Sequence, residues 1–356
     1  MTKTIQKIYQ DVLSLPTAPY HEHAVADFIR AFARRRGIPV KADRYGNIVV
    51  RYRRGNRPKP VALAGHMDHP GFEVLGADGR EVTARWDGAC DPQHFPGSRV
   101  IVCSAGEQIP GKVTSALGKD RTFTLGTSKT LHQVEGAFGH WRLKPFEIRG
   151  DRIYTKGADN LASCAAILAA IDRLNRKKAD ADLWGVFTRA EETGFVGAGG
   201  IVDAGTVPKR VPLIVLETSL ELPGAVMGDG PVIRVGDRMS LFDPRVEYAI
   251  HAVARELEQR VRGFAFQRQL MSGGSCEASL YMLHGMAVGA LAFPLGGFHN
   301  IGRRWPVEEH IAVRDAQGMV DLCAALALNP PAGEPRASMK RRLSASFREK
   351  KKLLLR

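Results

Sequence analysis

The chain has 356 residues, of which 44% are hydrophobic and 25% are charged. This is the composition of an ordinary globular protein and excludes a wholly disordered or fibrous chain. The longest uncharged helical run, about residues 162–171, is half the length that crosses a membrane, so no membrane span is predicted. Residues 1–16 have spaced charges and no apolar block, so no signal peptide is predicted.

The net charge of +14 is concentrated at the C-terminus. Residues 336–356 hold nine Lys or Arg and one Glu, which gives +8, and the other 335 residues carry only +6. We interpret residues 331–356 as a solvated basic tail, with contact to a polyanion or a membrane surface as the alternative. A nucleic-acid partner would rest on this tail alone and is disfavoured, because the charge elsewhere is nearly ordinary.

The cysteines indicate a reducing compartment. Their number is odd, they are widely spaced, and they form no C-x-x-C pair, which argues against a disulfide framework or a cysteine-based zinc site. We therefore expect a cytoplasmic protein. The five are Cys90, Cys103, Cys164, Cys276 and Cys323.

Residues 1–70 are predicted to form two helices followed by two strands. Apolar residues recur at helical spacing from Ile5 to Leu15 and again from Val25 to Phe32. Residues 47–52 and 60–66 are strand candidates, and the second is almost continuously apolar, as a buried strand is.

Residues 71–150 have a different residue pattern from the segments on either side. Short strand-like pieces, EVTARW, SRVIVCS, TFTLGT and FEIRG, alternate with turns that contain Gly or Pro, and no long amphipathic helix is visible. This pattern predicts a small all-β domain. Because such a module would leave edge strands uncovered, we expect it to carry a subunit contact.

Residues 151–330 return to alternating helices and strands. Helices are predicted at about 161–174, 244–262, 273–284 and 315–328, and strands at 182–189, 211–217 and 286–294. The chain is therefore predicted to be an α/β protein with a mixed, largely parallel sheet covered by helices on both faces and an inserted small all-β domain. The parts 1–70 and 151–330 together form the main domain.

Two Gly-rich segments have more than one interpretation. The segment GFVGAGG, residues 194–200, is better explained by tight packing than by a phosphate loop. The segment Ser272–Ser275 opens a predicted helix, where it either caps the helix or binds an anion. No Walker P-loop, G-x-S-x-G elbow or H-E-x-x-H motif is present.

Metal-binding residue types stand where predicted strands end or a helix begins. In an open α/β sheet these places converge in the crevice beyond the C-terminal strand edges. Each residue alone has an ordinary explanation: a hydrogen-bonded His, a helix N-cap for the Asp, a solvated surface pair for the adjacent Glu residues. Their shared placement favours a metal site instead. The residues are His66, Asp159, Glu191, Glu192, Glu217 and His299, with Asp68 two positions after His66.

The chemistry of this set suits divalent ions. Two imidazoles and three of the carboxylates, acting as ligands, match Zn²⁺, with Co²⁺ or Mn²⁺ possible. A pair of ions needs one carboxylate that bridges them. Asp68 is placed to orient the imidazole of His66. Of the adjacent acids Glu191 and Glu192, one can bind a metal while the other serves as general base.

With these residues the sequence resembles the co-catalytic dinuclear-metal aminopeptidases of the glutamyl and tetrahedral aminopeptidase type. The resemblance covers about residues 5–328, through the segments GNIVV, AGHMDHPGF, GADNLASCAAIL, FTRAEETGFVGAGG, MGDGPVIRVGDR, SGGSCEAS, and FHN followed by VEE. It implies a metallopeptidase that acts on peptides with a free N-terminus, holds two divalent ions per subunit and forms homo-oligomers.

The resemblance also implies a role for each residue. His66 and Glu217 would hold one ion, Glu192 and His299 the other, and Asp159 would bridge them. Glu191 would be the general base, with Asp68 behind His66. The family inserts its dimerisation domain between the first His and the bridging Asp, an interval of 93 residues here that contains the β-rich segment.

One residue departs from the family pattern. Position 217 is usually Asp in these aminopeptidases, whereas related deacylases more often have Glu there. The alternative function is therefore an N-acyl-amino-acid amidohydrolase with the same dinuclear site. Related carboxypeptidases and aminoacylases insert their extra domain between the later Glu and the final His. Here that interval, from Glu217 to His299, reads as core helix and strand, which favours the aminopeptidase.

Overall fold

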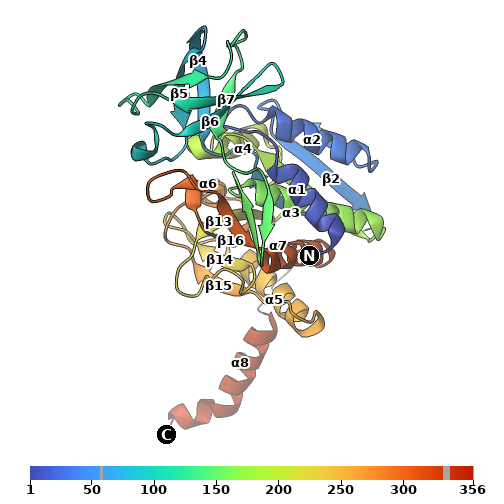
Figure 1. Ribbon diagram of the computed structural model, residues 1–356. Coiled ribbons are helices and arrows are strands. Elements are labelled where there is room, and N and C mark those ends of the chain that lie inside the picture. The colour runs from blue at the N-terminus through green and yellow to red at the C-terminus, as the bar shows by residue number, and fades with distance from the viewer. Residues whose placement is uncertain (57–58, 332–336, 356) are drawn as a thin grey trace.

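A computed structural model describes residues 1–56, 59–331 and 337–355 of the chain. An α/β body lies in the middle, a β-barrel lies at one end of it, and a helix projects from the opposite end (Figure 1). Residues 332–336 and 356 of the predicted tail lie outside the described residues.

The body is built on a mixed sheet of eight strands within the described ranges. Their order is β1 (Val40–Ala42), β2 (Ile48–Arg54), β12 (Ala181–Thr188), β3 (Val61–His66), β13 (Leu213–Leu220), β16 (Val288–Leu295), β14 (Val232–Gly236) and β15 (Gln267–Leu270). The predicted mixed sheet is confirmed. It is parallel from β12 to β16 and between β14 and β15, whereas the other neighbouring strands pair antiparallel.

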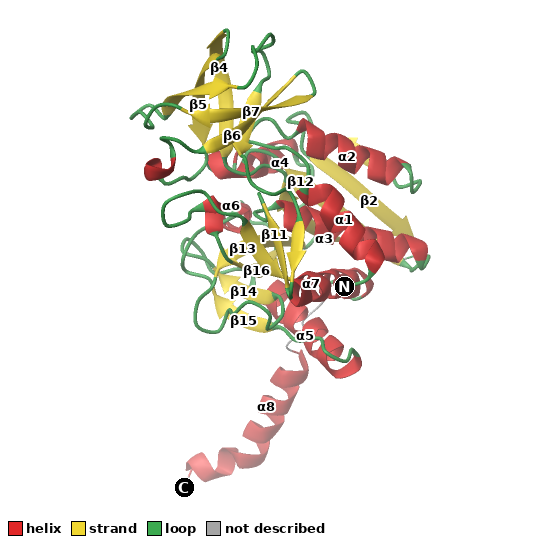
Figure 2. Ribbon diagram, viewed as in Figure 1, coloured by secondary structure: helices red, strands yellow, loops and turns green. Residues whose placement is uncertain are grey.

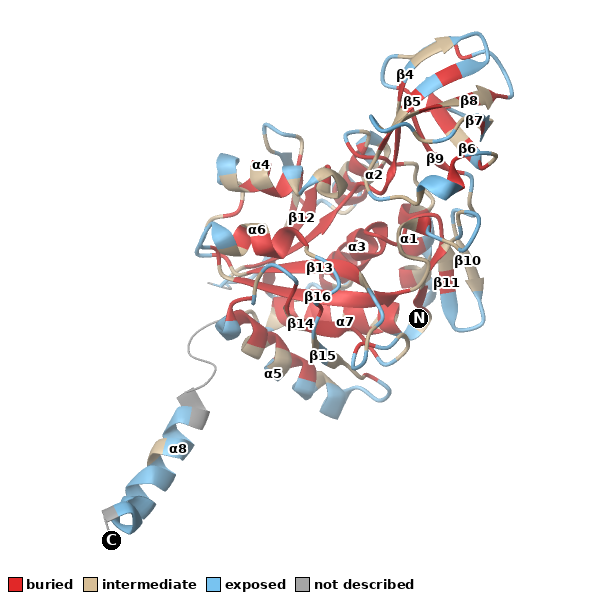
Figure 3. Ribbon diagram, turned by 90° about the vertical axis from the view of Figure 1, so that its left-hand side faces the viewer, coloured by how far each residue is buried: buried red, intermediate tan, exposed pale blue. Residues whose placement is uncertain are grey.

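Helices cover both faces of this sheet (Figure 2). One face packs against α1 (Lys3–Leu13), α2 (His23–Arg34), α3 (Leu161–Arg176), α5 (Pro244–Arg260) and α7 (Val313–Leu328). The other packs against α4 (Val196–Ala204) and α6 (Glu277–Leu283). Helix α3 lies between the sheet, α1 and α7, and its residues 161–172 are buried all round (Figure 3). The buried centre gives the strand ends a rigid support.

The Gly-rich segment after Glu192 is not a loop, because most of it is helix α4. A Cβ atom at Gly197 would lie 2.2 Å from the backbone oxygen of Arg189. The predicted tight packing is therefore confirmed, and the glycines allow α4 to lie directly against the strand end that carries the acidic pair.

The insertion forms a closed antiparallel barrel. Its strands run β4 (Gly71–Asp78), β5 (Glu81–Asp87), β8 (Thr122–Thr127), β7 (Glu107–Val113), β6 (Arg99–Ser104) and β9 (Phe138–Trp141), with a short helix η1 (Pro92–His94). The rings of Trp86, Phe95 and Trp141 pack together in its interior, with Phe95 edge-on to both tryptophans. The expectation of uncovered edge strands was wrong, because ring closure pairs every strand of the barrel with two neighbours.

The last piece assigned to the insertion belongs elsewhere. Strand β10 (Glu147–Arg149) pairs with β11 (Arg152–Thr155), which pairs with β17 (Glu309–Ala312), in a separate three-stranded sheet. This sheet places the segment before α3 beside the segment that follows β16. It therefore brings the neighbourhoods of Asp159 and His299 together.

The structure also bears on the cysteines, on membrane spans and on the C-terminal tail. All five cysteines are free thiols, so the absence of a disulfide framework is confirmed. Among the described helices, none combines the length and apolarity needed to cross a membrane. The basic tail is helical, with α8 (Ala337–Lys350) and the turn η4 (Lys351–Leu355).

Candidate metal centre

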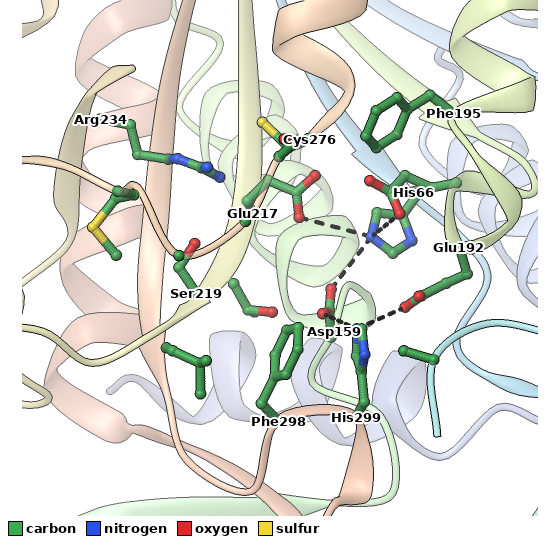
Figure 4. A pocket seen from close by; sticks show the side chains of 18 of the residues that line it. His66, Asp159, Glu192, Phe195, Glu217, Ser219, Arg234, Cys276, Phe298 and His299 are labelled. Atoms are coloured by element: carbon green, nitrogen blue, oxygen red, sulfur yellow. Dashed lines mark ion pairs between the residues drawn. The ribbon is translucent and has the colours of Figure 1, made fainter. Parts of the chain in front are cut away.

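The five predicted ligands converge at the C-terminal edge of the four parallel strands. His66 ends β3, Glu217 lies in β13, and Glu192 and His299 follow β12 and β16 in the short helices η2 (Glu191–Thr193) and η3 (Phe298–Asn300). Asp159 reaches the same point from the turn before α3. Figure 4 shows their side chains pointing toward one another. The common edge of parallel strands is what unites residues so far apart in sequence.

Asp159 occupies the middle of the cluster. One of its oxygens, Oδ1, lies 3.3 Å from His66 Nε2, and the other, Oδ2, lies 3.3 Å from His299 Nε2. Glu217 Oε2 is 3.7 Å from His66 Nε2, and Glu192 Oε1 is 3.4 Å from His299 Nε2. The donor atoms thus form two triads that share Asp159, and within each triad the atoms lie within 4.8 Å of one another.

The ordinary explanations of Asp159 and of the two adjacent Glu residues do not hold. Asn160, not Asp159, is the N-cap residue of α3. The side chains of Glu191 and Glu192 are only 11% and 5% exposed, so the pair is not a solvated surface feature.

Glu191 stands apart from the two triads. Its Oε2 atom is 3.9 Å from His66 Nε2. Glu191, His66 and Glu192 form a third group whose donor atoms lie within 4.8 Å of one another. The preceding residue, Ala190, has left-handed backbone with φ of 48°. This turn presents both acids to the cluster from consecutive positions.

Asp68 holds two parts of the site at once. It lies 3.3 Å from His66 Nδ1, as the sequence predicted. Its two oxygens also accept hydrogen bonds from the backbone N–H groups of Glu191 and Glu192, at 3.0 and 3.1 Å. Asp68 therefore fixes the imidazole and the acidic turn relative to each other.

Sequence reasoning missed two buried supports of the cluster. Glu309 accepts a hydrogen bond from the backbone N–H of Asp159 at 2.8 Å and another from that of His299 at 2.7 Å. His69 contacts the backbone oxygen of Asp159 and lies 2.9 Å from Asn300 Oδ1. Burial lowers the pKa of His69 to about 4. The only sequence signals were the VEE segment after FHN and the position of His69 one residue after Asp68.

Electrostatics shows that the cluster has an excess of negative charge. Burial raises the pKa of Glu192 to about 8 and raises the pKa of Glu191 well above its usual range. Burial alone would lower the pKa of His299, but Glu192 and Asp159 raise it to about 9. Protons are held tightly here because the carboxylates repel one another away from water. A divalent cation would relieve the same repulsion.

The donor atoms themselves fit metal ions. Glu192 Oε1, which belongs to one triad, and Glu217 Oε1, on the carboxylate whose Oε2 faces His66, are buried and have no hydrogen-bond partner in the described parts of the chain. Imidazole nitrogens and carboxylate oxygens are the ligands of zinc and its neighbours. Unpaired buried acceptors of this kind are costly unless a cation satisfies them.

A cavity of about 340 Å³ opens onto the cluster. Phe195 and Phe298 line it beside the predicted ligands, and Arg234, Ser219 and Cys276 form the wall beyond Glu217 (Figure 4). Ser275 also lines the cavity. Ser275 is not the cap of α6, because the N-cap residue is Cys276.

Arg234 is unusual for a buried cation. It is 3% exposed, its Nε has no hydrogen-bond partner, and no carboxylate of the described chain lies within ion-pair distance of it. The hydroxyls of Thr218 and Ser275 on the same wall are also buried and unpartnered. Donors left unsatisfied on a cavity wall are positioned to bind a ligand.

Comparison with known proteins gives consistent matches. The sequence model of the M42 glutamyl aminopeptidase family matches residues 129–314. A provisionally named aminopeptidase of Acetivibrio thermocellus is 27% identical over 288 residues, which are 73% of this chain and 81% of that protein.

Two solved structures illustrate the shared fold. The TET1 peptidase of Pyrococcus horikoshii, described as assembling into a tetrahedron or a large octahedral shell, has a TM-score of 0.74 at 19% identity, covering 91% of this chain and 99% of its own. The aminopeptidase APDkam598 of Desulfurococcus kamchatkensis has a TM-score of 0.76 at 20% identity, covering 94% of this chain and 96% of its own.

Proposed function

Because this chain belongs to the M42 glutamyl aminopeptidase family, we propose that it removes N-terminal residues from peptides with the help of two divalent ions. Membership makes the chain a metallopeptidase. The number of ions rests on the two donor triads that share Asp159. We propose His66 and Glu217 as ligands of one ion and Glu192 and His299 as ligands of the other. Zn²⁺ is the first candidate for both, with Co²⁺ or Mn²⁺ as alternatives.

Glu191 is the proposed general base. When bound, two such ions lower the pKa of a water molecule and polarise the scissile carbonyl. The Glu191 carboxylate accepts the proton of the attacking water and then gives it to the departing amine. Asp68 acts by holding the Glu191 backbone and the His66 ring.

The cavity wall that contains Arg234 indicates which N-terminal residue of the substrate is preferred. A carboxylate on the N-terminal side chain of the substrate would accept hydrogen bonds from Arg234, Thr218 and Ser275, whose donors are otherwise unpaired. The family name also refers to glutamyl substrates. We therefore propose that peptides beginning with Glu or Asp are preferred substrates.

Replacing Arg234 by Gln should reverse this preference. We expect kcat/KM for a glutamyl anilide to fall by about 10–10²-fold, because a charge-assisted hydrogen bond is lost, and that for an alanyl anilide to change little. Arg238→Gln, on an exposed neighbour, is the matched control. An equal loss on both substrates would mean that Arg234 acts on Glu217 rather than on the substrate.

The alternative function is the N-acyl-amino-acid amidohydrolase, favoured only by Glu at position 217. The placement of the barrel before Asp159 and the family match over residues 129–314 both support the aminopeptidase instead. The two functions differ in the charge they accept at the substrate nitrogen. An aminopeptidase binds a free amine against carboxylates, whereas an amidohydrolase accepts an acyl group there.

Free and N-acetylated substrates separate these functions. We expect an unblocked aminoacyl anilide to be cleaved far more than tenfold faster than its N-acetyl form, because the acetyl group forfeits a charge-assisted hydrogen bond and adds bulk beside Glu217. Glu217→Asp should keep this preference and change the rate modestly. Faster cleavage of N-acetyl amino acids would replace the aminopeptidase by the amidohydrolase.

We further propose that residues 1–70 and 151–330 form the catalytic domain and that the barrel carries a subunit contact. The assembly of the P. horikoshii TET1 peptidase supports a homo-oligomer. Light scattering should therefore give a mass of at least twice 39.0 kDa at micromolar concentration. Removal of the barrel should reduce the number of subunits in the assembly. A monomeric intact protein would contradict the proposal.

A further inference from the structure

The C-terminal helix has two kinds of exposed side chain at once. Residues 337–355 carry seven Lys or Arg and one Glu. Among them, Leu343 is 61%, Phe347 60% and Leu354 79% exposed. Leu343 and Phe347 are four residues apart in α8, so they lie on the same face of the helix, one turn from each other.

This segment lies against nothing else that the structure describes. Figures 1 and 3 show α8 projecting from the end of the body opposite the barrel, with its surface exposed. The side-chain hydrogen bond recorded within it, from Arg348 Nε to the Ser344 oxygen, stays inside the helix. Several large apolar side chains grouped on one exposed segment indicate a surface that a partner covers.

The charges limit what that partner can be. The first 335 residues of the chain carry a net charge of +6, so the overall charge of the same or a second copy does not attract the cationic helix. A nucleic acid would satisfy the cations but would leave the apolar face in water. An anionic lipid surface accepts both, because the apolar face enters the acyl boundary while Lys and Arg contact the headgroups.

We propose that residues 337–355 form an amphipathic anchor that attaches the protein peripherally to anionic lipid bilayers. Leu343 and Phe347 insert into the interface, and the flanking cations contact lipid phosphates and carboxylates. A single short helix of this kind binds weakly and reversibly. In a homo-oligomer several such helices would act together and bind more tightly.

Co-sedimentation of the full-length protein with vesicles tests the anchor. We expect binding to phosphatidylcholine vesicles that contain about 30% phosphatidylserine, and at least about tenfold weaker binding to phosphatidylcholine alone, because the cations contribute much of the attraction. Raising the salt from about 0.1 to about 1 M should weaken binding to a similar extent. Equal binding to both vesicles, or to neither, would overturn the proposal.

Two variants separate an inserted helix from simple charge attraction. The double substitution Leu343→Ser and Phe347→Ser keeps every charge and should weaken vesicle binding by about tenfold or more. The matched control is Leu283→Ser, at a 74% exposed leucine of α6, which should bind as the unmodified protein does. Unchanged vesicle binding by the double variant would overturn the proposal.

Binding of the same proteins to DNA tests the alternative that the tail binds nucleic acid rather than lipid. A fluorescent DNA duplex that binds as tightly as the anionic vesicles, and equally to the double variant, would assign the tail to nucleic acid instead. Turnover of a small aminoacyl anilide should be the same for all these proteins, because the helix lies away from the cavity. The outcome is therefore independent of whether the proposed peptidase activity is correct.

Discussion

Glu191→Gln should retain the bound metal and lose about 10²–10⁴-fold in kcat, because a neutral amide cannot accept the proton of the attacking water. The amide has nearly the same shape as the carboxylate, and the Asp68 hydrogen bond to the backbone of residue 191 does not depend on the side chain. The fold of the turn should therefore survive. Metal content and turnover are measured on the same preparation, so that loss of metal is not mistaken for loss of the base.

The neighbouring acid provides a matched comparison. Glu192 Oε1 lies 3.4 Å from His299 Nε2, inside the triad proposed for the second ion. Glu192→Gln should therefore lose metal as well as activity. If Glu191→Gln instead loses metal, or turns over at the unmodified rate with full metal, the base is a different group.

Asp159→Asn should be the most damaging change to metal binding. A carboxylate can bridge two cations through two charged oxygens, whereas an amide offers one neutral oxygen. Because residues that only support ligands typically alter metal affinity by 10–100-fold, we expect loss of the shared ligand to exceed about 10²-fold. Activity at limiting metal should fall in parallel.

Metal titration followed by mass spectrometry under native conditions checks this result. The unmodified protein should take up two ions and the variant at most one. Asp203→Asn, at an exposed acid on α4, controls for the loss of a charge. Two ions bound with unmodified affinity in Asp159→Asn would show that the bridge does not exist.

The sequence by itself determined the parts of the site that follow directly from strand ends. A short continuous apolar run such as VALAG is typical of a buried strand, and His66 stands at its end. The same holds for Thr188 before the acidic pair and for Leu295 before His299. Parallel strands share one edge, which is why these residues meet.

The tertiary structure decided whatever depends on contacts between distant segments. Glu309 supports Asp159 and His299 only because β17 pairs with β11, and nothing local to Glu309 records that pairing. Arg234 lies on β14, a short strand that the sequence pattern did not predict. Its position in the cavity wall could therefore not be predicted either. Strand β15, with the sequence QRQL, has no apolar alternation, and it pairs with β14 while its side chains hydrogen-bond to neighbouring segments.

Packing also overrode local preference in two places. Helix α4 contains three glycines, each of which costs a helix about 1 kcal/mol relative to alanine. One of them, Gly197, permits contact with the strand end beneath the helix, and Gly200 permits contact with Tyr45 and Asn47. The barrel closes because β4 and β9 pair across more than sixty residues of sequence. The sequence pattern of a short strand is the same in an open sheet and in a closed barrel. The pairing of the first and last strands arises only in the folded chain.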